Sequence, residues 1–273
     1  MAAPITVIIP CKDEAVNIAD CIASVRPIAA EILVADSGSS DETLEIVARA
    51  GGCRVIEREY VDSANFKNWA IPQATHEWIF LIDADERLTP ELVAEIQAIV
   101  ARAPEKDGYW VYRANYFMGK RIRFSGWQND RVIRLFRRDV SRYEDILDHS
   151  EVQLAPERVG RLRHRMPHFT YRSYDQYFPK FHRYTKRSAA FRYSRGRRPS
   201  GLQLLLRGPF RFLRSYILKL GFLDGLAGLQ LSVLSGFYSY MKEARLWELD
   251  QQARLDRHRA SEADCSEPQR RAA

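Results

Sequence analysis

Cysteine is scarce in this chain of 273 residues: there are four, far apart and without the C-x-x-C spacing of metal sites. The sequence therefore predicts neither a zinc site nor a disulfide framework, and it is typical of a reducing compartment. The chain also has no G-x-G-x-x-G and no G-x-x-x-x-G-K-[ST] segment, which excludes the usual dinucleotide-binding and P-loop sites. No internal repeat is present. No basic segment precedes an apolar run at the N-terminus, so we expect no signal peptide there.

Charge is unevenly distributed along the chain. The composition, with 46% hydrophobic and 28% charged residues, excludes a disordered or low-complexity chain. The net charge is +7, yet residues 1–100 have a net charge of −10 and residues 101–219 one of +18. The basic part must face an anionic partner or be heavily solvated. Phosphate-rich ligands, nucleic acid and the negative membrane surface all qualify as partners.

The first hundred residues alternate between short apolar runs and amphipathic segments. The run Ile5–Ile9 has no polar break, which is typical of a strand buried on both faces. From such patterns we expect strands at 5–9, 31–35, 54–57 and 78–82, and helices at 14–25, 40–50, 66–74 and 88–102. This alternation predicts an α/β fold with a mainly parallel mixed sheet flanked by helices.

Polar residues follow three of these strands, at the edge where open α/β sheets bind ligands. Asp83 and Asp85 supply carboxylate oxygens for Mg²⁺ or Mn²⁺, which would allow an acidic cleft to hold a nucleoside diphosphate. Asp36 can accept hydrogen bonds from a ribose or a base edge, and Ser37-Gly38 forms a turn that lets the backbone come close. Each segment alone could also be an ordinary capped turn, but three in succession favour a site.

The segments VIIPCKDE, LVADSGSSDET and FLIDADE, in this order, resemble the family 2 glycosyltransferases, which have the GT-A fold. The resemblance implies that Asp85 and Asp83 hold a divalent metal, Mg²⁺ or Mn²⁺, with Asp85 the preferred ligand. It also implies a set of nucleotide-sugar-binding residues. These are Pro10, Lys12, Glu14, Asp36, Ser37, Gly38, Lys67, Asp83, Ala84 and Asp85.

The segment from Gly126-Trp127-Gln128 to Arg137-Arg138 resembles a narrower bacterial group, the lipopolysaccharide core glucosyltransferases. It implies a set of acceptor-binding residues: Trp127, Gln128, Arg131 and Arg134. That group has a His-Glu pair shortly afterwards. Here His149 matches, Ser150 replaces the glutamate, and Glu151 comes one residue late.

Inversion at a sugar carbon needs one base to take the proton of the acceptor hydroxyl. Glu151 and Asp148 are the leading candidates for this base. Asp145, beside Glu144, is third, and His149 is the remaining one. A solvated loop without a catalytic role is the alternative for this segment.

The second half of the chain divides into further regions. We expect a GT-A domain over residues 1–155, with a nucleotide-binding half (1–100) and an acceptor half (101–155). A basic, aromatic, helical region that associates with membranes should follow over 156–249, and a charged, disordered tail over 250–273. Residues 220–241 contain a single charged residue but several glycines. They therefore predict a membrane-seated helical hairpin, or a packed helix pair, rather than a span.

The sequence thus predicts an inverting, metal-dependent glycosyltransferase on the cytoplasmic face of the inner membrane. It would transfer a sugar from a nucleotide donor, such as UDP-glucose, to a lipopolysaccharide-core or other lipid-linked or phosphorylated glycan. One alternative is an inactive glycan-binding or scaffold protein on the same fold, which the shifted Glu151 leaves open. The other is an RNA-associated protein; the acidic first hundred residues argue against it, and we expect no nucleic-acid partner.

Overall fold

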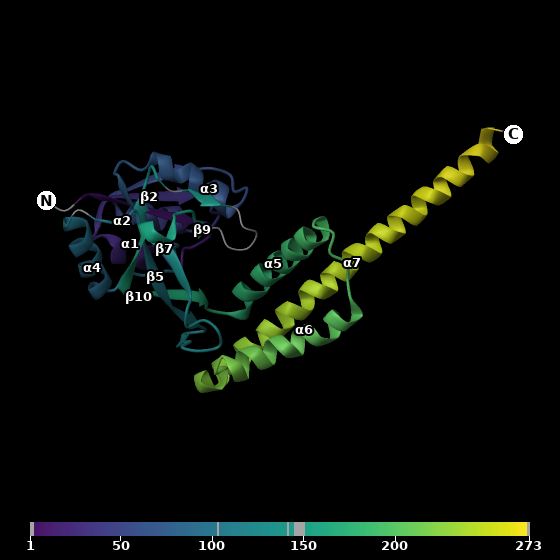
Figure 1. Cartoon of the computed structure of the whole chain (residues 1–273). Helices are drawn as coiled ribbons and strands as arrows, with labels where there is room; N and C mark the ends of the chain where they lie inside the picture. Colours follow the sequence, from purple (N-terminus) through teal and green to yellow (C-terminus); the bar gives the residue numbers. More distant parts are fainter. Residues whose placement is uncertain (1–2, 103, 141, 145–150, 272–273) are drawn as a thin grey trace. The chain divides into compact units, whose positions relative to one another are not determined.

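The computed structural model describes residues 3–102, 104–140, 142–144 and 151–271. The chain divides into two compact units (Figure 1). The first comprises Met1–Arg123 with Trp127–Arg172, and the second comprises Phe124–Gly126 with Ser173–Ala273.

A mixed sheet forms the centre of the first unit. Its strands are β1 (Ile5–Cys11), β2 (Ala29–Asp36), β3 (Cys53–Glu57), β4 (Trp78–Leu81), β5 (Gly108–Phe117), β6 (Lys120–Arg121), β7 (Arg131–Arg137) and β10 (Val159–Tyr171). The order is β10-β5-β7-β4-β1-β2-β3, with β6 paired to β5. Strand β1 is parallel to β2 and β4, and β7 is antiparallel to both β4 and β5. The predicted α/β fold with a mixed sheet is confirmed.

Helices cover both faces of the sheet (Figure 1). They are α1 (Ile18–Val25), α2 (Thr43–Ala50), α3 (Ser63–Ala70) and α4 (Pro90–Ala101), with the short helix η1 (Ile71–Gln73) after α3. Apolar residues of α1, α2 and α4 share one core with β1, β2 and β4, whereas α3 packs in the other core. Because Thr89 accepts a hydrogen bond from the Leu92 amide and Pro90 opens the helix, α4 begins where the sequence predicts.

A small hairpin packs beside α3. Strand β8 (Tyr143–Glu144) pairs antiparallel with β9 (Glu151–Val152), and the short helix η2 (Pro156–Arg158) follows. The side chain of Asn68 in α3 accepts from the Tyr143 amide and donates to the Tyr143 carbonyl, each at 2.8 Å. Asn68 therefore fixes β8 next to α3.

The predicted boundary at residue 155 is wrong, because the first unit continues to Arg172. Residues 159–171, expected in a helical region, form β10, which pairs with β5 in parallel and buries Leu162 and Met166 in the core. Arginine alternates with other residues over 161–166, a period of two that is typical of a strand. The high basic content of this segment masked that period.

The second unit is helical. Its helices are α5 (Tyr174–Ser194), α6 (Gly201–Leu213), the π-helix η3 (Arg214–Leu218), the short helix η4 (Gly221–Asp224) and α7 (Gly225–Arg271). Glu243 of α7, which is buried, pairs with Arg192 of α5 at 2.6 Å and with Arg207 of α6 at 2.5 Å. The predicted disordered tail over 250–273 is corrected, since α7 continues without a break to Arg271.

By length and apolarity, no single helix of the described chain could cross a membrane. A helix pair, Gly201–Leu218 with Gly221–Arg259, meets that criterion only together and is bent by 71° at the break.

Glu31 ties the strands of the first unit together and gives a stability prediction. Burial alone would raise the pKa of this carboxyl, but hydrogen bonds from the Thr6 hydroxyl, the Thr75 amide and Arg54 lower it to about 2. Because the pKa is depressed in the folded state, the stabilisation is complete above pH 4.5 and is lost as the pH falls toward 2. We expect Glu31→Gln to lower the free energy of unfolding by about 2 kcal/mol at pH 7. Urea unfolding at pH 7 and pH 3 tests this, with the exposed Glu59→Gln as control; an equal loss at both pH values would contradict it.

Candidate active site

The loops after β1 and β2 form the first part of the site. The parallel register pairs Cys11 with Asp36, so the two strand ends meet. The fully buried Asp36 carboxylate accepts hydrogen bonds from the Gly38 and Ser39 amides (2.8 Å each) and from the Ser39 hydroxyl (2.5 Å). The Ser39 hydroxyl in turn accepts from the Asp13 amide at 2.9 Å. Asp36 therefore holds the turn after β2 in shape and against the loop after β1.

The other predicted donor-binding residues of these loops lie at the same edge. Pro10 is half-buried and Lys12 is exposed. Glu14 is half-buried and accepts from Asn17 Nδ2 at 2.6 Å, while the buried Ser37 hydroxyl donates to a backbone carbonyl of β1. The structure thus brings these residues together as the sequence predicts, and their contact with a nucleoside stays a prediction.

The carboxylates after β4 form the second part, beside β1. The Asp83 carboxylate pairs with Arg134 and lies 3.6 Å from Lys67 Nζ. The same Arg134 nitrogen lies 2.6 Å from the fully buried Glu86, whose second cationic partner is Arg113 at 3.4 Å. Buried charges are tolerated only when they are paired, and here each carboxylate has two cations.

The titration behaviour of these groups follows from this pairing. Burial alone would raise the pKa of Asp83, but Arg134 and Lys67 hold that pKa far below its ordinary value. Burial lowers the pKa of Lys67, which Asp83 only partly offsets. Burial also raises the pKa of Tyr143, whose ring centroid lies 5.0 Å from Lys67 Nζ. Asp83 is therefore an anion neutralised by protein cations, which leaves it less suited than Asp85 to bind a metal.

Asp85 has a neighbour that the sequence analysis missed, His168 of β10. His168 Nε2 lies 3.6 Å from Asp85 Oδ2, and Nδ1 lies 2.6 Å from Asn115 Oδ1. Asn115 donates its amide to Asp130, so its oxygen faces the ring and Nδ1 carries the proton. This arrangement turns the lone pair of Nε2 toward Asp85, as in metal-ligating histidines.

This pair fits a divalent metal. A carboxylate and an imidazole nitrogen are suitable donors, and diphosphate oxygens and waters commonly complete such a site. Within the described part of the chain, no cluster of three or more His, Cys, Asp or Glu residues is arranged around one ion. The chain would therefore supply Asp85 and His168, and the substrate the other ligands.

Of the four candidate bases, Glu151 is the one that lies within the described residues. Asp145, Asp148 and His149 fall outside the described residues. Glu151 is exposed at the start of β9, directly across from Glu144 of β8. Tyr143 of β8 contacts Lys67, which in turn pairs with Asp83, so β8 lies one side chain away from Asp83.

The predicted acceptor-binding residues divide into two groups. Arg134 is only 3% exposed and bound to Asp83 and Glu86, so it holds the turn after β4 and is not available to an acceptor. Trp127 is half-buried and Arg131 is exposed, and the Arg131 guanidinium lies 4.6 Å from the Trp110 ring centroid.

Gln128 lines a small cavity of about 150 Å³ together with four arginines. These arginines are Arg113, Arg121, Arg123 and Arg165. Neither Arg121 nor Arg165 forms an ion pair with a carboxylate among the described residues. An anionic group of an acceptor fits this cavity on charge.

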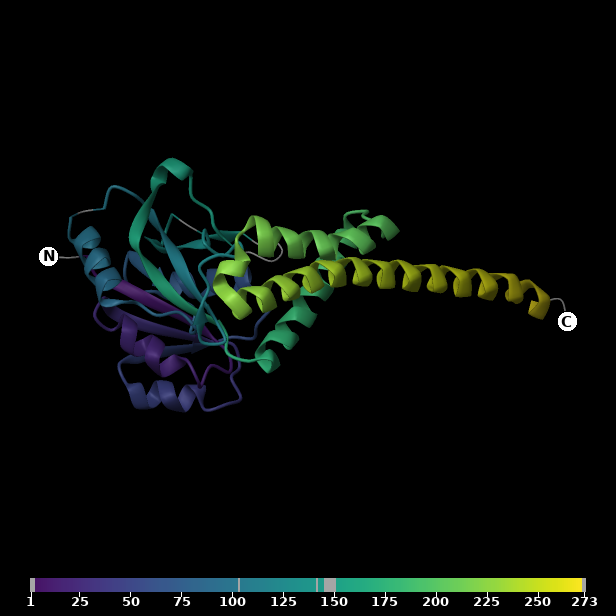
Figure 2. The same ribbon diagram turned by 90° about the horizontal axis from the view of Figure 1, so that it is seen from below.

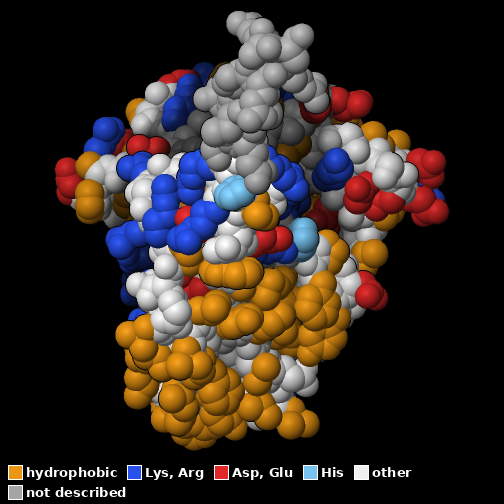
Figure 3. All heavy atoms as spheres, turned by 90° about the vertical axis from the view of Figure 1, so that its right-hand side faces the viewer, with side chains coloured by type: hydrophobic (Ala, Val, Ile, Leu, Met, Phe, Trp, Pro, Cys, Tyr) orange, Lys and Arg blue, Asp and Glu red, His pale blue; other side chains and the backbone are white. Residues whose placement is uncertain are grey.

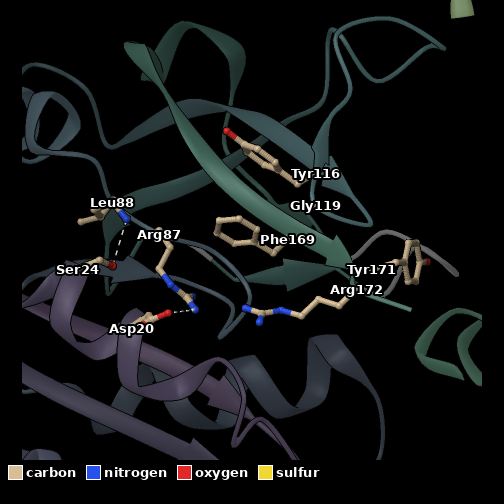
Figure 4. Close-up of a pocket in the computed structure, with 9 residues that line it drawn as sticks. All are labelled: Asp20, Ser24, Arg87, Leu88, Tyr116, Gly119, Phe169, Tyr171 and Arg172. Atoms are coloured by element: carbon tan, nitrogen blue, oxygen red, sulfur yellow. Dashed lines mark hydrogen bonds and ion pairs between the residues drawn. The ribbon is translucent and has the colours of Figure 1, made fainter. Parts of the chain in front are cut away.

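A larger cavity of about 720 Å³ lies behind the turn after β4 (Figure 4). Phe169 stands between the guanidinium groups of Arg87 and Arg172, at 5.7 and 5.8 Å from its ring centroid. Adjacent strand residues point to opposite sides, so Phe169 and His168 face away from each other. None of the predicted donor-binding residues lines this cavity. Arg87 instead braces the turn by donating to the carbonyl of the buried Ala84 at 2.7 Å.

A mixed sheet with carboxylates and hydroxyls at the carboxyl ends of β1, β2 and β4 defines a GT-A-like fold. The model of the family described as Glycosyl transferase family 2 matches residues 6–210. The chain is 30% identical over 251 residues to the lipopolysaccharide core biosynthesis glycosyltransferase LpsC of Rhizobium meliloti (strain 1021), with 90% of this chain and 92% of that one covered. It is 26% identical over 254 residues to an uncharacterized glycosyltransferase of Rickettsia bellii (strain RML369-C), with 88% and 85% covered. The chain therefore belongs to glycosyl transferase family 2 and resembles the lipopolysaccharide core glycosyltransferases.

Two solved structures are also similar. S. aureus TarS 1–349 matches with a TM-score of 0.45 and 12% identity over 92% of each chain. Glucosyl-3-phosphoglycerate synthase from Mycobacterium tuberculosis, in complex with Mn²⁺, UDP and glucosyl-3-phosphoglycerate, matches with a TM-score of 0.33 and 21% identity. That match covers 43% of this chain and less than half, 45%, of the other.

Proposed function

We propose that this protein is an inverting, metal-dependent glycosyltransferase that transfers a hexose from a UDP-sugar to a lipopolysaccharide-core or other lipid-linked glycan. The observation that carries this proposal is the Asp85–His168 pair at the carboxyl end of β4, beside the nucleotide-binding loops. The likeness to LpsC supports the acceptor class.

Each part of the site has a role in this reaction. The loops after β1 and β2 bind the nucleoside, with Asp36 holding their shape. Lys67, which is half-buried, lies close enough to Asp83 to orient a diphosphate against the turn after β4. Asp85 and His168 would hold Mg²⁺ or Mn²⁺, which when bound neutralises the charge of the departing diphosphate as a Lewis acid.

The base in this proposal is Glu151. Direct displacement requires one carboxylate to accept the proton of the attacking hydroxyl, and no second catalytic carboxylate. Glu151 is exposed at the start of β9, so an acceptor can reach its carboxylate. The arginines around Gln128 would bind an anionic group of that acceptor, which suits a phosphorylated glycan.

The location we propose is the cytoplasmic face of the inner membrane, peripheral to the bilayer. Between residues 174 and 200 the chain has eight Lys and Arg residues and a single acidic residue, Asp175. Such a segment is attracted to the anionic lipids of a cytoplasmic leaflet, and a lipid-linked acceptor would be found there.

Transfer from UDP-glucose to lipopolysaccharide-core acceptors, with and without Mn²⁺, tests the function. We expect a β-linked product by NMR, because UDP-glucose is α-linked and the reaction inverts. Glu151→Gln should lower kcat about 100- to 10,000-fold with little change in the affinity for UDP, since a base acts only in the chemical step.

The exposed Glu157→Gln, six residues further on, is the matched control and should leave kcat unchanged. A retained α configuration would overturn the inverting mechanism. If Glu151→Gln has full activity, the base must be sought among Asp145, Asp148 and His149. No UDP binding at all would favour the inactive scaffold.

A further inference from the structure

The helical hairpin formed by residues 201–241 exposes its large apolar side chains. Leu202, Leu205, Phe210, Leu218, Leu223 and Leu226 are each more than half exposed, with Leu226 at 74%. Figure 3 shows hydrophobic side chains gathered in one area in the lower part of the view, where Figure 1 has α6 and the first part of α7. An exposed apolar area of this extent marks an interaction surface.

Small residues occupy the contact between the two helices. Those that are buried include Gly208, Ser215, Gly221, Gly228, Ser232 and Gly236. Helices α6 and α7 run side by side in both ribbon views (Figures 1 and 2).

The glycines allow the two backbones to touch. A Cβ atom on Gly236 would lie 2.9 Å from the Gly208 carbonyl oxygen, and one on Gly228 would collide with the Gly221 carbonyl. Ser232 and Ser215 also form a hydrogen bond across the contact, at 3.3 Å.

The distribution of apolar and small side chains in this hairpin is the reverse of that in helix pairs that fold in water. An amphipathic helix pair in water buries its leucines and exposes its polar residues. Here only Leu231 and Leu234, among the large apolar residues of the hairpin, are buried, and the interface is made by glycine and serine. Small residues inside and leucines outside are typical of helices that pack in lipid, where leucine gains nothing from facing another helix.

The charges of the hairpin indicate which partner covers it. Arg211, Arg214 and Lys219 are interspersed with the exposed apolar residues, and their long stems can bring the charges to a headgroup layer. The preceding residues 174–200, with eight basic residues, are complementary to anionic lipids. In a dimer formed through the hairpin, the basic residues 174–200 of the two copies would repel each other. The charges therefore favour a bilayer over a second copy of the chain as the partner.

We propose that residues 201–241 lie in one leaflet of a lipid bilayer as a helical hairpin, with their exposed apolar side chains among the acyl chains. Hydrogen bonds hold the turn of the hairpin to residues 124–126, so this turn stays near the surface of the bilayer. The bent helix pair, apolar enough for a membrane only when taken together, agrees with entry and exit on the same side. The inference deepens the proposed location, and rests on it only for the choice of membrane, not on glycosyl transfer.

Environment-sensitive labels on the full-length chain test the insertion. The exposed Leu218 and Leu255, both leucines of the second unit, are replaced singly by cysteine in a Cys53→Ser, Cys265→Ser background. An NBD label at Leu218→Cys should shift to the blue and be quenched by brominated acyl chains on phosphatidylcholine–phosphatidylglycerol vesicles. The label at Leu255→Cys should do neither. Leu218→Glu with Leu223→Glu should reduce vesicle sedimentation at least tenfold, whereas Val16→Glu with Val61→Glu in the first unit should not.

Each other outcome overturns the proposal in a defined way. Binding that high salt abolishes, with an unchanged Leu218→Cys label, would mean electrostatic adsorption by residues 174–200. A blue shift without vesicles, together with a dimer in sedimentation velocity, would mean that a second copy covers the hairpin. Affinity for UDP, measured on the same variants without lipid, separates a failure of this proposal from a failure of the proposed function.

Discussion

Replacing His168 by alanine is expected to abolish the metal-dependent part of UDP binding, as is replacing Asp85. The two side chains face each other at 3.6 Å, one in the turn after β4 and the other in β10, more than eighty residues further along the chain. Each side chain would donate one of the two protein ligands of the metal. When either is lost, the chain keeps a single ligand, and water can take the place of the other. Titration of UDP by calorimetry with Mn²⁺ and with EDTA measures the effect. The Mn²⁺ electron paramagnetic resonance spectrum reports the metal without requiring catalysis.

Asn115 provides a graded companion to that experiment. Its oxygen accepts from His168 Nδ1 at 2.6 Å, so Asn115→Ala leaves both ligands in place but removes the closer partner of Nδ1 and leaves the Thr170 hydroxyl, at 3.2 Å, to orient the ring. We expect a loss of metal affinity of about 10- to 100-fold, smaller than for either ligand. His164→Ala, on the same strand but paired with Glu95, is the control and should bind Mn²⁺ normally. Normal Mn²⁺ binding by His168→Ala would show that the histidine is structural.

The loops after β1 and β2 could be predicted from the sequence because their signals are local. The strands that end at Cys11 and Asp36 are uninterrupted apolar runs, and parallel neighbours bring their ends to one edge whatever the rest of the fold. The turn after β4 is equally local, since Asp83 and Asp85 stand directly after a buried strand.

The partners of that turn could not be predicted, because they depend on pairing between distant strands. Arg134 reads as one of several exposed arginines in a basic segment, and only the antiparallel pairing of β7 with β4 brings it to Asp83. His168 lies in a strand that its arginines made resemble a membrane-surface segment. For both Arg134 and His168, the role of the side chain depends on a tertiary contact that the local composition does not indicate.

Arg134→Met is expected to lower the free energy of unfolding by about 3–5 kcal/mol at pH 7, the range for a buried ion pair that loses one partner. Methionine preserves the volume of the stem but leaves Asp83 and Glu86 with one cation each, at 3.6 and 3.4 Å. Arg131→Met, three residues earlier on the same strand, removes an exposed guanidinium that packs on Trp110 and should cost less than about 1 kcal/mol.

The pH dependence separates lost charge pairing from lost packing. In the native protein the pKa of Asp83 is depressed, so its contribution is complete above 3.8 and decreases as the pH falls below that value. Without Arg134 the pKa of Asp83 is depressed less, so the variant loses less of its free energy of unfolding on acidification than the native protein does. The deficit of Arg134→Met should therefore narrow when urea unfolding is repeated near pH 3. A deficit that is the same at both pH values would assign Arg134 a packing role, because apolar contacts do not titrate.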